Sequence, residues 1–178
     1  MRYSKRPNWD EYFMGWAIWA SRRAACHHVR AGCVIVQDKR VVGMGYNGAP
    51  AGIPNCLEEG CHKEREGLEY HSSLGSGKCI GVHAEMNALS HITGLLARDL
   101  SLYTTVFPCF SCTKTLLGYD LRKLFYMGAY NEDEMRNAIE LLNQRKVQVE
   151  KLTLTPEQTQ SFLFNLPPVD FDVFPRRG

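Results

Sequence analysis

The feature that most constrains the fold is a regular alternation of helix and strand patterns in the second half of the 178-residue chain. Helical spacing and short apolar runs follow one another from residue 83 onward, and a short helix beginning at Pro156 is predicted to follow the last strand. The predicted helices are 83–93, 109–119 and 132–144, and the predicted strands are 102–105, 123–127 and 147–151. Strands joined through helices pair in parallel, so the pattern predicts a layered α/β fold with parallel pairing in this half.

The first half of the chain predicts a helix and a hairpin. Asn8 and Glu11 have the spacing of a capping box, and the helix that they open is predicted to run to about Ala25. Its aromatic stripe is predicted to pack into the core; the stripe comprises Trp9, Tyr12, Phe13 and Trp16, continued by Ala17 and Ala20. Strands over 32–37 and 40–46, separated by a two-residue turn, predict an antiparallel hairpin.

Residues 48–81 form an insert without a helical or strand period. This stretch is rich in Gly, Pro, Ser and charged residues, and it is long for a loop in a compact domain. Something other than an apolar core must therefore order it. The rest of the chain is expected to form one domain over 1–178, with an irregular, Pro-rich tail over 165–178.

Composition narrows the class of function. The net charge of +2 gives no broad basic surface for a nucleic-acid backbone, so a small substrate is favoured. The longest apolar run, 14–20, is shorter than the roughly 18 residues of a membrane span. Acidic residues directly before this run argue against an export signal, so we expect a cytoplasmic protein. Seven cysteines, an odd number, then favour metal binding over a disulfide framework; Cys33, in a strand pattern, is expected to belong to the core.

One group of residues predicts a zinc site with an open position. His83 opens one predicted helix, and Cys109 and Cys112 lie in the first turn of another, directly after Pro108. Two thiolates three residues apart and one imidazole give three of the four ligands of a tetrahedral zinc, and the fourth position can hold water. H-x-E combined with P-C-x-x-C is the signature of zinc deaminases. The alternative is a structural zinc site with an unrecognised fourth ligand.

Glu85 supplies the acid that such a reaction needs. Zinc lowers the pKa of its bound water towards ~7, and a carboxylate beside it can carry the proton of that water to a ring nitrogen and then to the departing amine. Attack at C4 of a cytosine base would release ammonia. The backbone around Ala84 and Pro108 is the expected recognition surface for the base.

Over about residues 6–130 the sequence resembles the deoxycytidylate (dCMP) deaminase family. Four segments carry the resemblance: WDEYFM at 9–14, SRRAAC at 21–26, GYNGAPAG at 45–52 and VHAEMNA at 82–88. The resemblance implies a three-layer α/β/α fold with a mixed central sheet of about five strands, and hydrolysis of dCMP to dUMP and ammonia. It also implies that Asn47 contacts the sugar and that Tyr130, or less directly Arg6, lies near the phosphate. A turn residue with left-handed backbone is the alternative for Asn47, and a strand-end aromatic residue for Tyr130.

The same resemblance implies regulation of a homohexamer, activated by dCTP and inhibited by dTTP. The segment around the GYNG motif is the expected nucleotide loop, because glycines let backbone amides approach phosphates, and Mg²⁺ would accompany the triphosphate. The residues concerned are Gly45, Tyr46, Asn47, Gly48 and Gly52. The alternative is a plain connection between the hairpin and the insert.

A second, structural zinc would order the insert. Four thiolates close a tetrahedral site, and the expected ligands are Cys26, Cys56, Cys61 and Cys79. His71 is the alternate ligand in place of Cys61, and His62 is a more distant one. Free thiols in a flexible insert are the alternative, and His28, where some relatives have a basic phosphate ligand, is left without a definite role.

Two other functions compete. One is a related deaminase that acts on a nucleoside, a free base or a nucleic acid, which the charge and the GYNG segment disfavour. The other is a zinc module that binds a nucleotide without catalysis, against which Glu85 argues.

Overall fold

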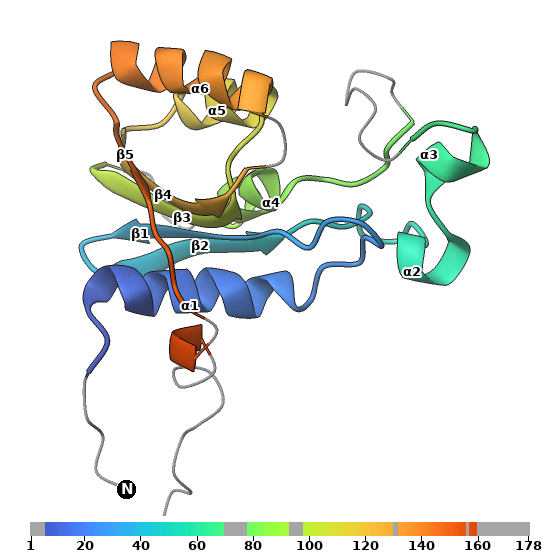
Figure 1. Ribbon diagram of the computed structural model, residues 1–178, viewed down its shortest axis with the longest axis horizontal. Coiled ribbons are helices and arrows are strands. Elements are labelled where there is room, and N and C mark those ends of the chain that lie inside the picture. The colour runs from blue at the N-terminus through green and yellow to red at the C-terminus, as the bar shows by residue number, and fades with distance from the viewer. Residues whose placement is uncertain (1–5, 70–77, 93–97, 130–131, 156, 160–178) are drawn as a thin grey trace, which may run out of the picture.

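The computed structural model describes residues 6–69, 78–92, 98–129, 132–155 and 157–159. Figure 1 shows a central sheet with α1 on one face and α5 and α6 on the other. Among these residues the sheet has five strands in the order β2-β1-β3-β4-β5. The predicted three-layer α/β/α architecture with a mixed sheet is confirmed. No helix among the described residues is long and apolar enough to cross a membrane.

The hairpin and the parallel half of the sheet form as predicted. Strands β1 (Gly32–Gln37) and β2 (Arg40–Tyr46) pair antiparallel, and the two residues between them, Asp38 and Lys39, have φ of 49° and 59°. Positive φ at both positions is the geometry whose twist matches that of the strands. Strand β3 (Leu100–Val106) pairs antiparallel with β1 and parallel with β4 (Leu121–Gly128), which pairs parallel with β5 (Gln148–Lys151).

Two apolar clusters pack on opposite faces of the sheet because strand side chains alternate. Cys33 and Ile35 of β1 face the helical layer of α4 (Ala84–Ser90), α5 (Phe110–Leu116) and α6 (Glu132–Gln144). Val34 and Val36 face α1 on the other side. Cys33 is fully buried and its burial raises the pKa of its thiol, so the prediction that it belongs to the core is confirmed.

Helix α1 (Trp9–Ser21) begins at the predicted capping box but ends four residues early. The Asn8 side chain accepts a hydrogen bond from the Glu11 amide at 2.8 Å, and the Glu11 carboxylate accepts one from the Asn8 amide at 2.8 Å. At the other end the Ala25 amide donates to the carbonyl of Asn47. The predicted end near Ala25 is therefore wrong, because a tertiary backbone contact takes the amide that a longer helix would use.

The aromatic stripe of α1 is only partly in the core. Phe13 is buried with the two alanines of the stripe, but Trp9, Tyr12 and Trp16 are 45%, 42% and 40% exposed. The core prediction is wrong for these three residues. They lie on the side of the helix next to the face that packs against the sheet, and at that position a side chain is not covered by the sheet.

The described part of the insert contains two short helices, and the insert joins the domain at both ends. Helix α2 (Cys56–Glu59) and helix α3 (His62–Arg65) lie beyond one end of the sheet in Figure 1. Gly48 and Val82, at the borders of the insert, form an isolated antiparallel bridge with N···O distances of 3.2 and 2.8 Å. The tail over 165–178 lies outside the described residues.

Two glycines of β2 let α4 approach the sheet closely. A Cβ built on Gly43 would lie 2.5 Å from the carbonyl oxygen of Ala88, and one built on Gly45 would lie 2.4 Å from that of Ala84. Both obstacles are backbone atoms, which cannot swing aside. The side-chain Nδ2 of Asn87 in α4 also donates a hydrogen bond to the carbonyl of Tyr46 in β2 at 2.6 Å.

We expect Gly45→Ala to destabilise the fold by about 1–3 kcal/mol or more, because α4 must move off the sheet. Chemical denaturation measures this. Gly128→Ala is the matched control, since its nearest neighbour would lie 3.9 Å away. Equal unfolding midpoints for Gly45→Ala and the unmodified chain would contradict the close contact.

Candidate active site

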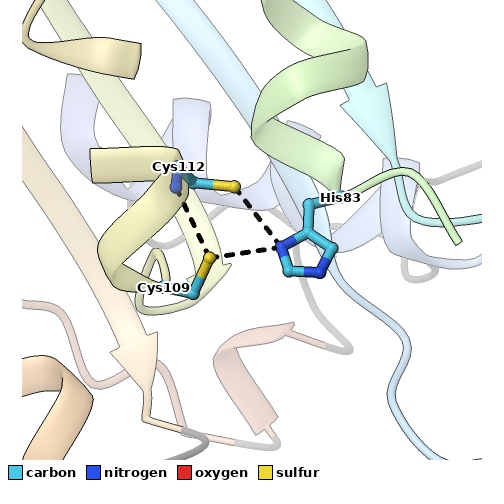
Figure 2. A group of neighbouring side chains, drawn as sticks. All are labelled: His83, Cys109 and Cys112. Carbon is cyan, nitrogen blue, oxygen red and sulfur yellow. Dashed lines mark hydrogen bonds between the residues drawn. The ribbon is translucent and has the colours of Figure 1, made fainter. Parts of the chain in front are cut away.

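Three metal-binding side chains converge where two helices begin. His83 is the N-cap residue of α4, Cys109 is the N-cap residue of α5, and Cys112 lies in the first turn of α5. The Nδ1 atom of His83 lies 3.5 Å from the Cys109 sulfur and 3.3 Å from the Cys112 sulfur. Figure 2 shows both sulfurs directed towards this nitrogen. The structure thus brings together the three residues that the sequence predicted.

The spacing of these atoms fits a tetrahedral zinc ion. Zinc–sulfur distances of about 2.3 Å and zinc–nitrogen distances of about 2.0 Å place a sulfur and a nitrogen ligand about 3.5 Å apart in a tetrahedron. The three donor atoms all lie within 4.8 Å of one another. Thiolate and imidazole donors also match the ligand preference of zinc, so these residues could hold it with one position left open.

The protonation of the three groups favours a cation at their centre. The hydrogen bond from the Cys112 thiol lowers the pKa of Cys109 to about 4, and the proximity of these two sulfurs raises the pKa of Cys112. The hydrogen bond with Cys109 raises the pKa of His83. A divalent cation would displace the protons that the three groups otherwise share.

Glu85 lies beside the three donors without joining them. It is in the first turn of α4, only 4% exposed, and its carboxylate is not among the donor atoms that lie within 4.8 Å of one another. Burial raises the pKa of Glu85, partly offset by His83 and by a hydrogen bond with Cys112. A buried acid with a raised pKa next to an open metal position has the properties of a proton carrier.

One cavity extends from this site to the insert. Its lining includes His83, Ala84, Glu85 and Cys109, the end of β3 at Val106 and Phe107, and the hairpin end at Asn47 and Gly48. The ring of Phe107 is held edge-on against Tyr126, with centroids 4.9 Å apart. No sequence pattern marks Val106 and Phe107 as lining residues, apart from their position directly before the Pro-Cys pair.

The other residues predicted to contact the substrate differ in whether they line the cavity. Ala84 lines the cavity, whereas Pro108 is fully buried behind its neighbours. Arg6 is exposed ahead of α1 and does not line the cavity. Tyr130 lies outside the described residues.

Asn47 holds the backbone on one side of the cavity. Its Oδ1 accepts from the Ala31 amide at 2.7 Å and its Nδ2 donates to the Val29 carbonyl at 2.8 Å. Its φ is negative, so the alternative of a left-handed turn residue is wrong. Each polar atom keeps one further hydrogen-bonding valence that a ligand in the cavity could use.

The segment expected to bind a regulatory nucleotide has a structural role at one of its glycines. Gly45 lies against α4, so its missing side chain is explained by helix packing. Tyr46 ends β2 and is 37% exposed, Gly48 forms the bridge to Val82, and Gly52 has a positive φ of 82° with open space around it.

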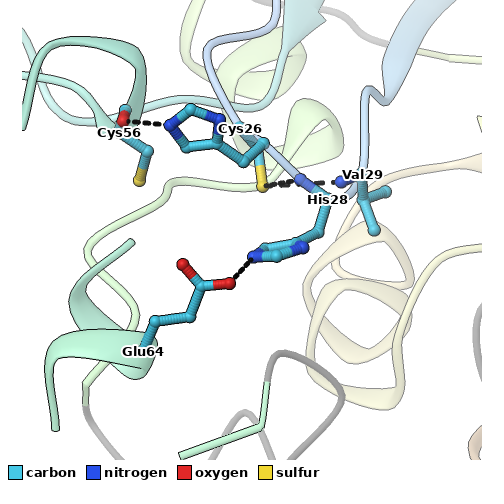
Figure 3. A network of polar contacts seen from close by, with 6 residues as sticks. Cys26, His28, Val29, Cys56 and Glu64 are labelled. Atoms are coloured by element: carbon cyan, nitrogen blue, oxygen red, sulfur yellow. Dashed lines mark hydrogen bonds and ion pairs between the residues drawn. The ribbon is translucent and has the colours of Figure 1, made fainter. Parts of the chain in front are cut away.

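The insert gathers the four cysteines predicted to bind a second zinc. Cys26, Cys56, Cys61 and Cys79 all line the cavity, and burial together with the charges of the other three raises the pKa of Cys56. The Cys26 sulfur accepts from the amides of His28 and Val29 at 3.5 Å each (Figure 3).

A different donor set in the insert is closer together. The Nε2 atom of His28 lies 2.9 Å from a carboxylate oxygen of Glu64. One donor atom each from His28, Glu64 and Cys61 all lie within 4.8 Å of one another. Figure 3 shows the contact between His28 and Glu64. Sequence reasoning missed both as ligands, although Glu64 follows Cys61 by one helical turn. His71 lies outside the described residues.

Comparison with known proteins agrees with this geometry. The family model for the cytidine and deoxycytidylate deaminase zinc-binding region matches residues 7–128. The deoxycytidylate deaminase of Mycobacterium phage D29 is 38% identical over 126 residues, covering 68% of this chain and 95% of that protein. That of Saccharomyces cerevisiae is 33% identical over 153 residues, which span 85% of this chain but only 47% of the yeast protein.

Solved structures give the same result for the fold. The dCMP deaminase of cyanophage S-TIM5, in complex with dCMP and dUMP, superposes with a TM-score of 0.65 at 26% identity. The match covers 83% of this chain and 99% of the phage protein.

The fold and the site together define a hydrolytic deaminase of the zinc-binding class. The chain belongs to the cytidine and deoxycytidylate deaminase family.

We expect Cys109→Ser combined with Cys112→Ser to remove one zinc ion per chain, because two of three ligands are lost. Elemental analysis of the purified variants measures the metal. Cys33→Ala is the control, since that cysteine is buried in the core and should leave the metal content unchanged. Unchanged zinc in the double variant would mean that the metal is held elsewhere.

Proposed function

We propose that this protein hydrolyses dCMP to dUMP and ammonia. The observation that carries the proposal is the buried Glu85 beside three convergent zinc-type donors. The choice of dCMP is supported by relatives named deoxycytidylate deaminases and by the similar phage enzyme crystallised with dCMP and dUMP.

His83, Cys109 and Cys112 would hold the zinc, which when bound supplies Lewis-acid activation of a water molecule. Glu85 accepts one proton from that water, whose oxygen bonds to C4, and delivers it to N3 of the cytosine ring. It then takes the second proton from the same oxygen and delivers it to the amino group, so that the C4–N bond breaks, ammonia leaves and the C4 carbonyl forms. Its burial keeps the carboxylate in one place and away from bulk solvent. Ala84 and Phe107 form the wall against which the base lies, and Asn47 offers its remaining valences to the sugar.

A related deaminase acting on a nucleoside or a free base is the second candidate, because these substrates share the reacting ring. Turnover of dCMP, CMP, deoxycytidine, cytosine and single-stranded DNA, compared by ammonia release, separates the possibilities. The proposal requires dCMP to have the highest kcat/KM. Faster turnover of deoxycytidine would reject it.

Regulation belongs to the same proposal. dCTP would activate and dTTP would inhibit a cytoplasmic homohexamer, with Mg²⁺ on the triphosphate and the 45–52 segment as its binding loop. The open surroundings and positive φ of Gly52 support close approach of a phosphate there. Initial rates with and without each triphosphate test the effect, and sedimentation tests the assembly.

A second zinc in the insert is also proposed. Cys26, Cys56, Cys61 and Cys79 supply thiolates in one region, and His28 and Glu64 lie close enough to Cys61 to replace some of them. Such an ion would order a segment that lacks an apolar core of its own.

We expect Glu85→Gln to lower kcat by about 10²–10⁴-fold, because the amide cannot carry the proton. Zinc content should not change, since Glu85 is not among the donors. Ammonia release and elemental analysis measure the two quantities, with the exposed Glu140→Gln as control. Activity at the level of the unmodified chain would show that another group transfers the proton.

We expect Cys61→Ser to reduce the zinc content from two ions per chain to one, because Cys61 belongs to both proposed donor sets. Comparing Cys56→Ser with Glu64→Gln then tells the two sets apart. One zinc per chain in the unmodified protein would reject the second site.

A further inference from the structure

The wall of the candidate active site contains an aromatic ring whose backbone is held from two sides. Phe107 lines the cavity two residues before Cys109 and is 5% exposed. Its amide donates a hydrogen bond to the carbonyl of Gly128 at 2.7 Å. The next residue is the fully buried Pro108, and a proline restricts the backbone of the residue before it to extended conformations. The freedom left to Phe107 is therefore the rotation of its side chain.

The ring of Tyr126 limits that rotation. It stands at 87° to the ring of Phe107, and the two ring centroids are 4.9 Å apart. A perpendicular arrangement is one of the preferred geometries of aromatic pairs, and it stabilises them beyond the burial of the two rings. A Phe107 ring that turned about its side-chain bonds would lose this contact or collide with the tyrosine. The contact therefore holds the angle at which Phe107 faces the cavity.

Tyr126 is itself held by the sheet. It lies in β4, where it pairs with Thr104 of β3 on one side and with Lys151 of β5 on the other. Its carbonyl accepts a hydrogen bond from the amide of Leu152 at 2.7 Å, and its ring packs against the apolar cluster beneath the helical layer. Tyr126 is not among the described residues that line the cavity, whereas Phe107 is. Its influence on the site therefore passes through Phe107.

Ala84, the other residue proposed as a wall for the base, is supported by a strand. A Cβ built on Gly45 of β2 would lie 2.4 Å from the carbonyl oxygen of Ala84, so the start of α4 rests directly on β2. Ala84 cannot retreat from a ligand without moving the helix off the sheet. A methyl group supported in this way and an aromatic ring of fixed angle give the base end of the cavity a fixed width.

We infer that Tyr126 is a positioning residue: by holding the Phe107 ring it sets the width of the base end of the cavity, and the site thereby selects a one-ring base over a two-ring base. The inference rests on the proposed function, which places the cytosine ring against Ala84 and Phe107. A well-packed wall tolerates little overpacking, so a purine would have to displace the Phe107 ring and break its contact with Tyr126. That cost falls on the larger base alone.

Kinetics of Tyr126→Ala with dCMP as substrate and dAMP as competing ligand test the inference. Without the tyrosine ring, Phe107 can turn into the space behind it. We expect kcat/KM for dCMP to fall about 3–10-fold, the size of an aromatic-pair contact, mainly through kcat because the cytosine ring is held less precisely. The inhibition constant of dAMP should fall about tenfold or more, because the cost of overpacking is removed. Tyr126→Phe keeps the ring and should preserve both values.

Phe125→Leu is the matched control for a purely structural role. Phe125 neighbours Tyr126 in β4, but its ring stacks on that of Tyr103, with centroids 4.7 Å apart, on the other face of the sheet. Loss of this pair should lower the unfolding midpoint without changing the preference for dCMP over dAMP. A double-mutant cycle gives a second readout. In a Phe107→Leu background, Tyr126→Ala should change dCMP kinetics by no more than about twofold, because the ring through which it acts is gone.

The results distinguish this inference from the function on which it rests. Unchanged dAMP inhibition in Tyr126→Ala would overturn the inference, and so would equal changes in Tyr126→Ala and Phe125→Leu or additive losses in the double variant. In each case the dCMP activity of the unmodified chain would still stand. Absence of dCMP turnover by the unmodified chain would reject the proposed function and the inference with it. Should Tyr126→Ala not fold, Tyr126→Leu removes the ring with a smaller loss of volume and gives the same comparison.

Discussion

The close contact between α4 and β2 is the constraint on which the site depends. Two glycines on one face of β2 let the backbone of α4 lie directly on the strand, which places the start of the helix at the end of the sheet. His83 and Glu85 lie at that start, on either side of the residue whose carbonyl meets Gly45. Strand β3, which is parallel to β4, ends nearby and leads to Cys109. In open α/β sheets ligands commonly bind at the carboxyl ends of parallel strands.

The insert lines the cavity of the candidate active site and is also a peripheral addition to the fold. It contributes short helices and cysteines, but it also encloses the far end of the space that begins at the catalytic donors. A segment without its own apolar core can be held by a metal ion and by the bridge between Gly48 and Val82. Gly48 and the four cysteines of this region also line the cavity, so the order of the insert and the shape of the cavity are coupled.

Local sequence patterns predicted most of the elements correctly because local forces decide them. The Asn8 capping box, the turn at Asp38 and Lys39, and helix α6 over 132–144 all form where short-range spacing placed them. The errors lie where distant segments meet. Helix α1 ends early because Asn47 takes the Ala25 amide, and Trp9, Tyr12 and Trp16 stay exposed because the sheet covers only one face of the helix.

The sequence by itself determined the chemistry. The spacing of His83, Glu85, Cys109 and Cys112 is sufficient to predict three zinc ligands and a separate acid, because each pair lies within one turn at the start of a helix. Only the tertiary structure decided which groups share the cavity with them. His28 and Glu64 come together from segments 36 residues apart, and Lys63 is buried against the same space as Glu85 although no local pattern marks it. Burial and convergence depend on how the layers and the insert pack, and chain spacing alone does not contain that information.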